Sequence, residues 1–135
     1  MRVIGFSRKW PKLQQEEFTT FRFVRKDKDW TIGELVQVVY KPRSPEREVL
    51  GTAEIIQKEP RCMAWYDSRL VEPKVTNEEA IADGFMDTIA DRAAAYMWDW
   101  LMNIYGVRRL LDEPMNKLTL RWQEFCQQAE GKGKK

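Results

Sequence analysis

The sequence predicts a single α+β domain in which a small β-barrel of five or six strands, mixed or antiparallel, packs against flanking helices. One observation is a hairpin: residues 35–40 place apolar side chains on one face at period two, a loop with two prolines follows, and residues 49–57 return. A second is the strict alternation of apolar and polar residues over 116–122. A third is the helical spacing of apolar residues within 88–105, which gives that helix one face to pack on the barrel.

The hairpin supplies the central part of the predicted sheet. Its first strand directs Val36, Val38 and Tyr40 to one face. In the returning strand, Val49, Ala53 and Ile55 are expected to share a face. Gly51 interrupts that face, which predicts a β-bulge or a close approach of two backbones.

The N-terminal region predicts two further strands and a short helix. Residues 3–6 form the first strand, and Pro11 suits the first position of a short helix. Residues 18–24 are β-branched and aromatic, as is typical of strands. Their faces divide as Thr19, Phe21 and Phe23 on one side and Phe18, Thr20, Arg22 and Val24 on the other.

Two helices are predicted in the second half of the chain, after a possible strand at 61–67. Thr76 and Glu79 have the spacing of a capping box, and that helix ends near Gly84. Asp87 can cap the next helix, which runs from Thr88 to Tyr105. Its packing face comprises Ile89, Ala93, Met97, Leu101 and Ile104. The domain spans residues 1–125, and residues 126–135 are expected to form a disordered basic tail.

The composition excludes several classes of chemistry. The chain has no histidine, so Ser-His or Cys-His nucleophile pairs and His-ligated zinc or iron are impossible. Cys62 and Cys126 are too few for a structural zinc site and indicate no disulfide framework. We therefore expect no metal and no cofactor. The sequence has no apolar run of membrane-spanning length and no signal-peptide hydrophobic region, so we expect a cytoplasmic protein without membrane contact.

The charges are unevenly distributed along the chain, although the net charge is only +2. Residues 1–28 carry eight Lys or Arg side chains against three Asp or Glu. A basic end of this kind indicates a polyanionic partner such as RNA. The alternative is a solvated surface whose charges cancel in space.

Several short motifs follow one another along the chain. Residues 15–22 are Gln-Glu-Glu-Phe-Thr-Thr-Phe-Arg, and later motifs are Gly33-Glu34, Gly51-Thr-Ala53, Ala82-Asp83-Gly84-Phe85 and Tyr105-Gly106 before the strand 118–122. In order and spacing they resemble the ASCH domain (activating signal cointegrator homology), a small β-barrel related to the PUA fold. Members of that family carry Gly-x-Lys-x-x-Thr-x-Arg at the first of these motifs. The resemblance covers roughly residues 3–122.

The resemblance implies a cleft beside the barrel that suits RNA or a nucleotide. Some members are proposed to bind RNA, some are similar to amidohydrolases of acylated cytidine, and some are reported as ribonucleases. The amidohydrolase-like members use a Lys, a Thr and an acid, and Thr20 and Asp83 match the last two positions. The lysine position is Glu17, which offers no amine, although Lys12 or Lys26 would supply one from outside the motif. This departure favours a binding module over an enzyme.

Arg22 is the leading candidate for ligand binding, because a guanidinium can hold a phosphate or carboxylate with paired hydrogen bonds. The alternative is an internal partner such as Asp83. Thr20 and Asp83 are catalytic candidates if the protein is an enzyme, or an ordinary strand residue and a helix-end residue if it is not. Further ligand-binding candidates are Lys9, Lys12, Arg25, Lys26 and Tyr66.

Three functions remain open from the sequence. The first is an RNA- or nucleotide-binding module that uses the cleft. The second is a small hydrolase acting on a modified nucleoside or RNA, and the third is a protein-interaction module. Trp65 and Tyr66 can stack on a base or be buried in the barrel, whereas Trp98 and Trp100 are interpreted as packing residues.

Overall fold

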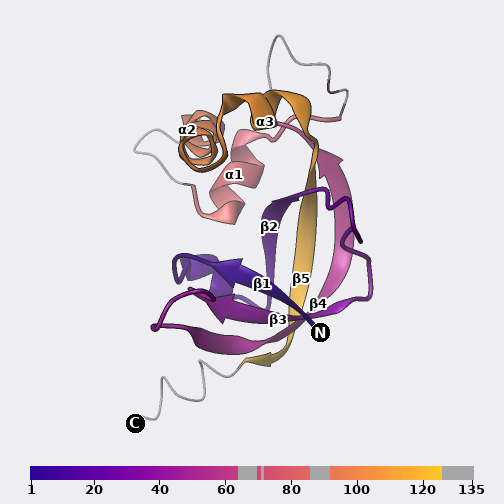
Figure 1. Cartoon of the computed structure of the whole chain (residues 1–135), viewed down its shortest axis with the longest axis vertical. Helices are drawn as coiled ribbons and strands as arrows, with labels where there is room; N and C mark the ends of the chain where they lie inside the picture. The colour runs from indigo at the N-terminus through magenta and orange to yellow at the C-terminus, as the bar shows by residue number, and fades with distance from the viewer. Residues whose placement is uncertain (64–69, 71, 86–91, 126–135) are drawn as a thin grey trace.

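The computed structural model describes residues 1–63, 70, 72–85 and 92–125, which form a curled β-sheet with the three α-helices gathered at one end (Figure 1). The strands are β1 (Arg2–Phe6), β2 (Glu17–Phe23), β3 (Leu35–Tyr40), β4 (Glu48–Arg61) and β5 (Met115–Phe125). The helices are the 3-10 helix η1 (Pro11–Gln14), α1 (Asn77–Asp83), α2 (Ala93–Tyr105) and α3 (Val107–Asp112). The predicted α+β class is confirmed.

The five strands form one mixed sheet in the order β1-β3-β4-β5-β2. β1 pairs with β3 in parallel, and the other three pairings are antiparallel. The long strands β4 and β5 occupy the middle, and the sheet curls around them into a half-barrel (Figure 1). β1 and β2 are therefore the two edge strands. The predicted hairpin is β3–β4, and β4 continues to Arg61, beyond its predicted end.

The predicted irregularity at Gly51 is confirmed. Val38 pairs with Gly51 and Val39 with Val49, so the pairing skips Leu50. Gly51 has a φ of 150°, and a Cβ there would collide with the carbonyl oxygen of Glu124 on β5. Because of the bulge, Leu50 joins the core instead of Val49, which is only half-buried. Val49 therefore does not share the buried face of Ala53 and Ile55, and that prediction is wrong.

Two apolar clusters make up the core, and β2 contributes to both. Phe18 packs inside the half-barrel, in a cluster that includes Ile4, Val36, Val38, Leu50, Ile55, Leu118 and Leu120. Phe21 and Phe23 pack in a second cluster with the helices, which includes Met97, Leu101, Leu110 and Met115. Both faces of β2 are used because its aromatic residues alternate as the sequence predicts. This strand therefore connects the half-barrel to the helices.

The capping box of α1 is present as predicted. The Glu79 amide donates to Thr76 Oγ1 and the Thr76 amide donates to Glu79 Oε1, each at 3.1 Å. Gly84 ends the helix in the left-handed conformation, with a φ of 114°. These two ends fix the position of Asp83, the last residue of α1.

Helix α2 ends before Gly106 as predicted, and its buried residues include Ala93, Met97 and Leu101. Ile104 is 56% exposed, so its predicted place on the packing face is wrong. The predicted cap at Asp87, the start at Thr88 and Ile89 lie outside the described residues. Most of the possible strand 61–67 and the whole tail 126–135 also lie outside the described residues. Helix α3 was not predicted from the sequence. None of the helices in the described part of the chain is long and apolar enough to span a membrane.

Glu79 also anchors α1 to the sheet. Arg61 on β4 donates to its carboxylate at 2.7 Å, and Lys117 on β5 donates at 2.9 Å. Burial raises the pKa of this carboxyl, but the hydrogen bonds from Arg61 and Lys117 outweigh that effect and lower the pKa to about 2. α1 is thus held by charge-assisted bonds to two strands.

We expect Glu79→Gln to destabilise the protein at neutral pH and to flatten its acid denaturation. A carboxyl whose pKa falls from the ordinary 4.5 to about 2 on folding stabilises the fold above pH 4.5, and this contribution disappears as the pH falls toward 2. The expected loss at pH 7 is about 2–3 kcal/mol, shrinking toward zero near pH 2. Urea unfolding at several pH values measures it. Glu113→Gln, at a more exposed ion pair with Arg109, is the control. Parallel stability curves for Glu79→Gln and wild type would contradict the expectation.

Candidate functional site

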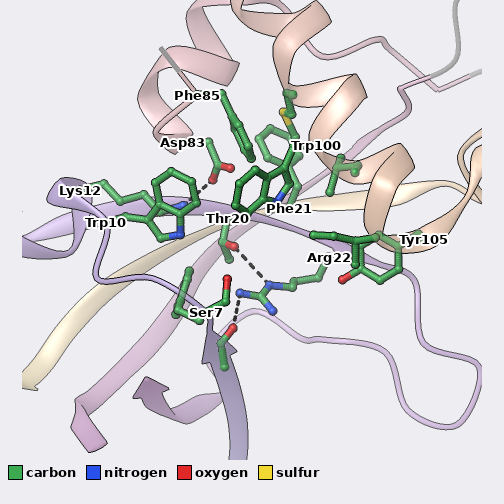
Figure 2. Close-up of a pocket in the computed structure, with 15 residues that line it drawn as sticks. Ser7, Trp10, Lys12, Thr20, Phe21, Arg22, Asp83, Phe85, Trp100 and Tyr105 are labelled. Atoms are coloured by element: carbon green, nitrogen blue, oxygen red, sulfur yellow. Dashed lines mark hydrogen bonds and ion pairs between the residues drawn. The ribbon is translucent and has the colours of Figure 1, made fainter. Parts of the chain in front are cut away.

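The candidate site is a pocket of about 260 Å³ between the half-barrel and the helices (Figure 2). β1 and β2 provide one side of it, η1 contributes a second, and α1 and α2 close it from above. Polar and charged groups line it together with aromatic rings. The residues that carry the argument are Trp10, Lys12, Thr20, Arg22, Asp83 and Trp100.

A buried ion pair links two of the contributing elements. Lys12 Nζ lies 2.6 Å from Asp83 Oδ1, and it also donates to the Thr19 carbonyl at 2.6 Å. The two side chains are only 4% and 8% exposed. Pro11 begins the short helix that carries Lys12, and Gly84 ends the helix that carries Asp83. The pair therefore joins residues 71 positions apart in the sequence.

Burial and pairing act against each other in this ion pair. Burial lowers the pKa of the Lys12 ammonium, and the attraction of Asp83 opposes that change. Burial likewise raises the pKa of the Asp83 carboxyl, opposed by Lys12 and by Arg22. Each side chain therefore stabilises the ionised form of the other. Loss of either partner leaves an uncompensated charge in a poorly solvated position.

Arg22 occupies the neighbouring position on the pocket wall and contacts Thr20. Its Nε donates to Thr20 Oγ1 at 3.2 Å, and its Nη2 donates to the Gly5 carbonyl at 2.9 Å. Burial lowers the pKa of the guanidinium, but arginine keeps its proton in proteins. Its Nη1 has no hydrogen-bond acceptor among the described residues. The carboxylate that Asp83 directs into the pocket is bonded to Lys12, so the alternative of a direct Arg22–Asp83 hydrogen bond is not realised.

Aromatic side chains line the other side of the pocket (Figure 2). Trp10 lies 5.4 Å from Phe85 and 5.8 Å from Trp100, measured between ring centroids. A Cβ at residue 84 would lie 2.6 Å from Trp10 Cε3, so only glycine lets the indole approach the end of α1 this closely. Gly84 thus serves both the helix end and the pocket wall.

The structure brings together Lys12, Thr20, Arg22 and Asp83 but not Lys9, Arg25 or Lys26. Lys9 pairs with Glu48 at 2.6 Å, and Arg25 pairs with Asp27 at 3.0 Å. Arg25 and Lys26 line a separate hollow next to Phe23 and Arg109, and Tyr66 lies outside the described residues. Glu17, at the position of the family lysine, is exposed and pairs with Arg121 at 2.7 Å. Of the two lysines that could replace it, Lys12 is in the pocket and Lys26 is not.

Most of the aromatic wall lies outside the site that the sequence predicts. Trp10, Phe85 and Tyr105 are not among the predicted site residues, and the sequence predicts a packing role for Trp100. Trp100 does pack against the helical cluster while lining the pocket, so packing describes only part of its position. The available signals were the position of Trp10 beside Pro11 and of Phe85 directly after Asp83-Gly84.

Comparison of the chain with protein-family models, with curated proteins and with solved structures finds no match. Within the described residues, no group of three or more Cys, Asp or Glu side chains is placed to hold a metal ion. For binding, the pocket offers two cations, one carboxylate, the hydroxyl groups of Ser7, Thr20 and Tyr105, and several aromatic rings.

We expect Lys12→Met to destabilise the protein by about 3–5 kcal/mol at pH 7, because it leaves Asp83 buried and charged without a partner. The pKa of Asp83 is already raised by burial and would rise further without the ammonium. The penalty should therefore be largest above that pKa and diminish as acid protonates the carboxyl. Urea unfolding at pH 7 and pH 5 measures the difference.

Two controls show whether the loss comes from the pair. Lys9→Met removes a lysine from a half-exposed ion pair and should cost less than about 1 kcal/mol. The double variant Lys12→Met with Asp83→Leu removes both buried charges and should recover much of the lost stability. A double variant as unstable as the sum of its single variants would show that the two side chains are not coupled.

Proposed function

We propose that this chain is an RNA- or nucleotide-binding module of the ASCH, PUA-like type, and that its pocket takes a single base or nucleotide. The observation that carries the proposal is the combination of aromatic walls with a cationic, hydrogen-bonding floor in one cavity. The order of sequence motifs and the half-barrel fold support the family assignment.

The size of the pocket suits one small planar group. Its volume of about 260 Å³ lies just below the range of about 300–1,000 Å³ that is typical of small-molecule sites. A base or a nucleoside fits such a space, whereas a folded RNA element does not. A longer RNA would therefore present one unstacked nucleotide to the pocket, as is common in single-strand recognition.

The charge of the pocket suits an electron-rich ligand. Lys12 and Arg22 contribute two positive charges and Asp83 one negative charge, so the group has a net charge of +1. Lys12 uses two of its donors on Asp83 and Thr19, and Arg22 retains Nη1 for a ligand. A carbonyl oxygen on a base edge or a phosphate oxygen is the expected acceptor.

The aromatic rings supply stacking surfaces for a base. Trp10, Phe85 and Trp100 lie within 6 Å of one another by ring centroids and all line the cavity. Stacking of one base on such a ring contributes about 1–3 kcal/mol and tolerates any base. The pocket can thus bind a nucleotide through stacking and use the Arg22 side for orientation.

The basic N-terminal segment adds less than its composition suggests. Counting only partners among the described residues, four of its eight cations are paired with carboxylates: Arg2 with Glu34, Lys9 with Glu48, Lys12 with Asp83 and Arg25 with Asp27. Two of those partners lie beyond residue 30 and a third beyond residue 80, so the charge asymmetry along the chain is partly cancelled in space. The pocket is accordingly a stronger basis for the proposal than a continuous phosphate track.

We expect a short labelled single-stranded RNA to bind weakly and with a marked dependence on salt. The log–log slope should be about −0.7 for each phosphate that the protein neutralises. Arg22→Gln should weaken binding about tenfold or more, because a charge-assisted hydrogen bond contributes about 1.5–3 kcal/mol. Fluorescence anisotropy at low and moderate salt measures both.

Arg121→Gln is the matched control for Arg22→Gln, since it removes a guanidinium from an exposed pair with Glu17 outside the pocket. It should leave RNA affinity within about twofold of wild type, which corresponds to less than 0.5 kcal/mol. Undetectable binding at low salt would contradict the proposed function. Equal losses in the two variants would show that binding uses general surface charge instead of the pocket.

A hydrolase acting on an acylated nucleoside is the second candidate, and the position of Lys12 favours it. Glu17 weighed against catalysis because it replaces the family lysine, but Lys12 brings an ammonium group into the pocket that contains Thr20 and Asp83. A lysine, a threonine and an acid are therefore all present. No hydrogen bond joins Lys12 to Thr20 within the described residues, and the Thr20 hydroxyl accepts from Arg22.

If the protein is such a hydrolase, the wild type should release the carboxylic acid from acylated cytidine. Thr20→Val should lower kcat at least a hundredfold, because Thr20 carries the only hydroxyl in the cluster of Lys12, Thr20, Arg22 and Asp83. Thr20→Ser keeps a hydroxyl and should retain part of the turnover. Chromatography of the released product measures the turnover of the wild type and of both variants. Absence of turnover in wild type, or turnover that survives Thr20→Val, would remove this candidate.

A further inference from the structure

We propose that Arg8 makes the pocket selective for a phosphorylated ligand: the base occupies the pocket and its phosphate binds the Arg8 guanidinium at the rim. This inference rests on the proposed nucleotide-binding function and extends it from a base or nucleoside to a nucleoside monophosphate. The phosphate can belong to a free nucleotide or to RNA, and a comparison of the two ligands separates these sources.

Arg8 lies on the aromatic wall of the pocket. Its guanidinium carbon is 4.9 Å from the centroid of the Trp10 ring and 4.5 Å from that of Trp100. Both indoles line the pocket, and so does Ser7, the residue that precedes Arg8 in the chain. Arg8 itself is exposed and is not part of the pocket lining. Its charged group is therefore at the rim, in contact with the two rings on which a base would stack.

The guanidinium of Arg8 makes no hydrogen bond or ion pair with the described residues. Arg2, Arg61 and Arg121 each bond a carboxylate at 2.7 Å. For Arg8, by contrast, no carboxylate or carbonyl of the described residues is within hydrogen-bond distance, and its only contacts of a specific kind are the two indole faces. An arginine that is held on aromatic rings, and that has no anionic partner in the described part of the chain, can bind an anionic ligand.

The geometry of this contact leaves the hydrogen-bond donors available. Cation–π contact uses the face of the guanidinium, whereas its five N–H groups point outward in the plane of the group. Phosphate oxygens bind that edge in a bidentate manner. Because Trp10 and Trp100 restrict the side chain, less conformational entropy is lost when the phosphate binds than for a free arginine.

Arg8 and Arg22 would then have different roles. Arg22 is half-buried, and its Nε and Nη2 are bonded to Thr20 and Gly5 inside the pocket, so it contacts the base or sugar. Arg8 lies outside the pocket lining, so the only part of a ligand that it can contact is a group that extends from the pocket. Removing Arg8 should affect ligands with a phosphate, whereas removing Arg22 should affect ligands with and without one.

The test compares the four ribonucleosides with their 5′- and 3′-monophosphates and with inorganic phosphate, by isothermal titration or by tryptophan fluorescence. In wild type, at least one monophosphate is expected to bind about tenfold more tightly than its nucleoside. In Arg8→Gln this advantage should fall to about twofold or less, while the nucleoside affinity changes little. Arg8→Lys keeps the charge without the planar edge and should retain an intermediate advantage.

Arg25→Gln is the matched control. Arg25 is also exposed, and its guanidinium carbon lies 5.6 Å from the centroid of the Trp30 ring, but neither residue lines the pocket. It should leave every affinity unchanged. A preference for the 5′- or 3′-monophosphate over a short RNA identifies a free nucleotide as the source of the phosphate, and the reverse identifies RNA.

Three results would overturn the inference. Equal affinities for nucleoside and monophosphate in wild type would contradict it while leaving the proposed function intact. Equal weakening of both ligands in Arg8→Gln would show that Arg8 only supports the indoles. Failure of every nucleoside, nucleotide and RNA to bind wild type would overturn the proposed function, and this inference with it.

Discussion

The buried ion pair between Lys12 and Asp83 is the interaction on which the site depends. It joins η1 to the end of α1, and through the Thr19 carbonyl it also holds β2. The removal of two charges from water costs several kcal/mol, and attraction in the interior offsets this only when the geometry is good and the remaining polar atoms are bonded. Such a pair is a poor source of stability. It does, however, fix three elements in one arrangement, because any displacement leaves a charge without its partner.

The surroundings of this pair show how one local arrangement serves packing and chemistry together. Gly84 ends α1 directly after Asp83 and allows Trp10 to lie against the helix end. Trp10 in turn contacts Phe85 and Trp100, so the aromatic wall forms where the ion pair brings η1 and α1 together. The same elements therefore give the pocket both its positive charge and its stacking surfaces. A cavity with only one of these features would suit a purely apolar or a purely ionic ligand.

Much of the fold could be predicted from the sequence because its signals are local. Period-two patterns predict β3 and β5, and β-branched and aromatic residues predict β2. The spacing of Thr76 and Glu79 predicts the start of α1, and Gly51 predicts the bulge. The errors arise where tertiary structure intervenes: the bulge exchanges Val49 for Leu50 in the core, and Ile104 is exposed near the end of its helix. For the site, Thr20, Arg22 and Asp83 were found through their motif positions. The partnership of Lys12 with Asp83 was not, because it spans 71 residues and lies outside the motif that drew attention to Glu17.

The hydrogen bond from Arg22 to the Gly5 carbonyl has a consequence for the sheet itself. Gly5 is on β1 and Arg22 on β2, which are the two edges of the half-barrel, so this side chain crosses the opening that the five strands leave. The guanidinium thus fastens the seam of the curled sheet and faces the pocket at the same time. Ligand binding and the Arg22–Gly5 hydrogen bond are therefore thermodynamically linked. A ligand that binds the guanidinium without breaking this bond stabilises the contact between β1 and β2, whereas a ligand that displaces Gly5 weakens it. In each case the bond changes the free energy of ligand binding by the same amount as the ligand changes the free energy of the bond.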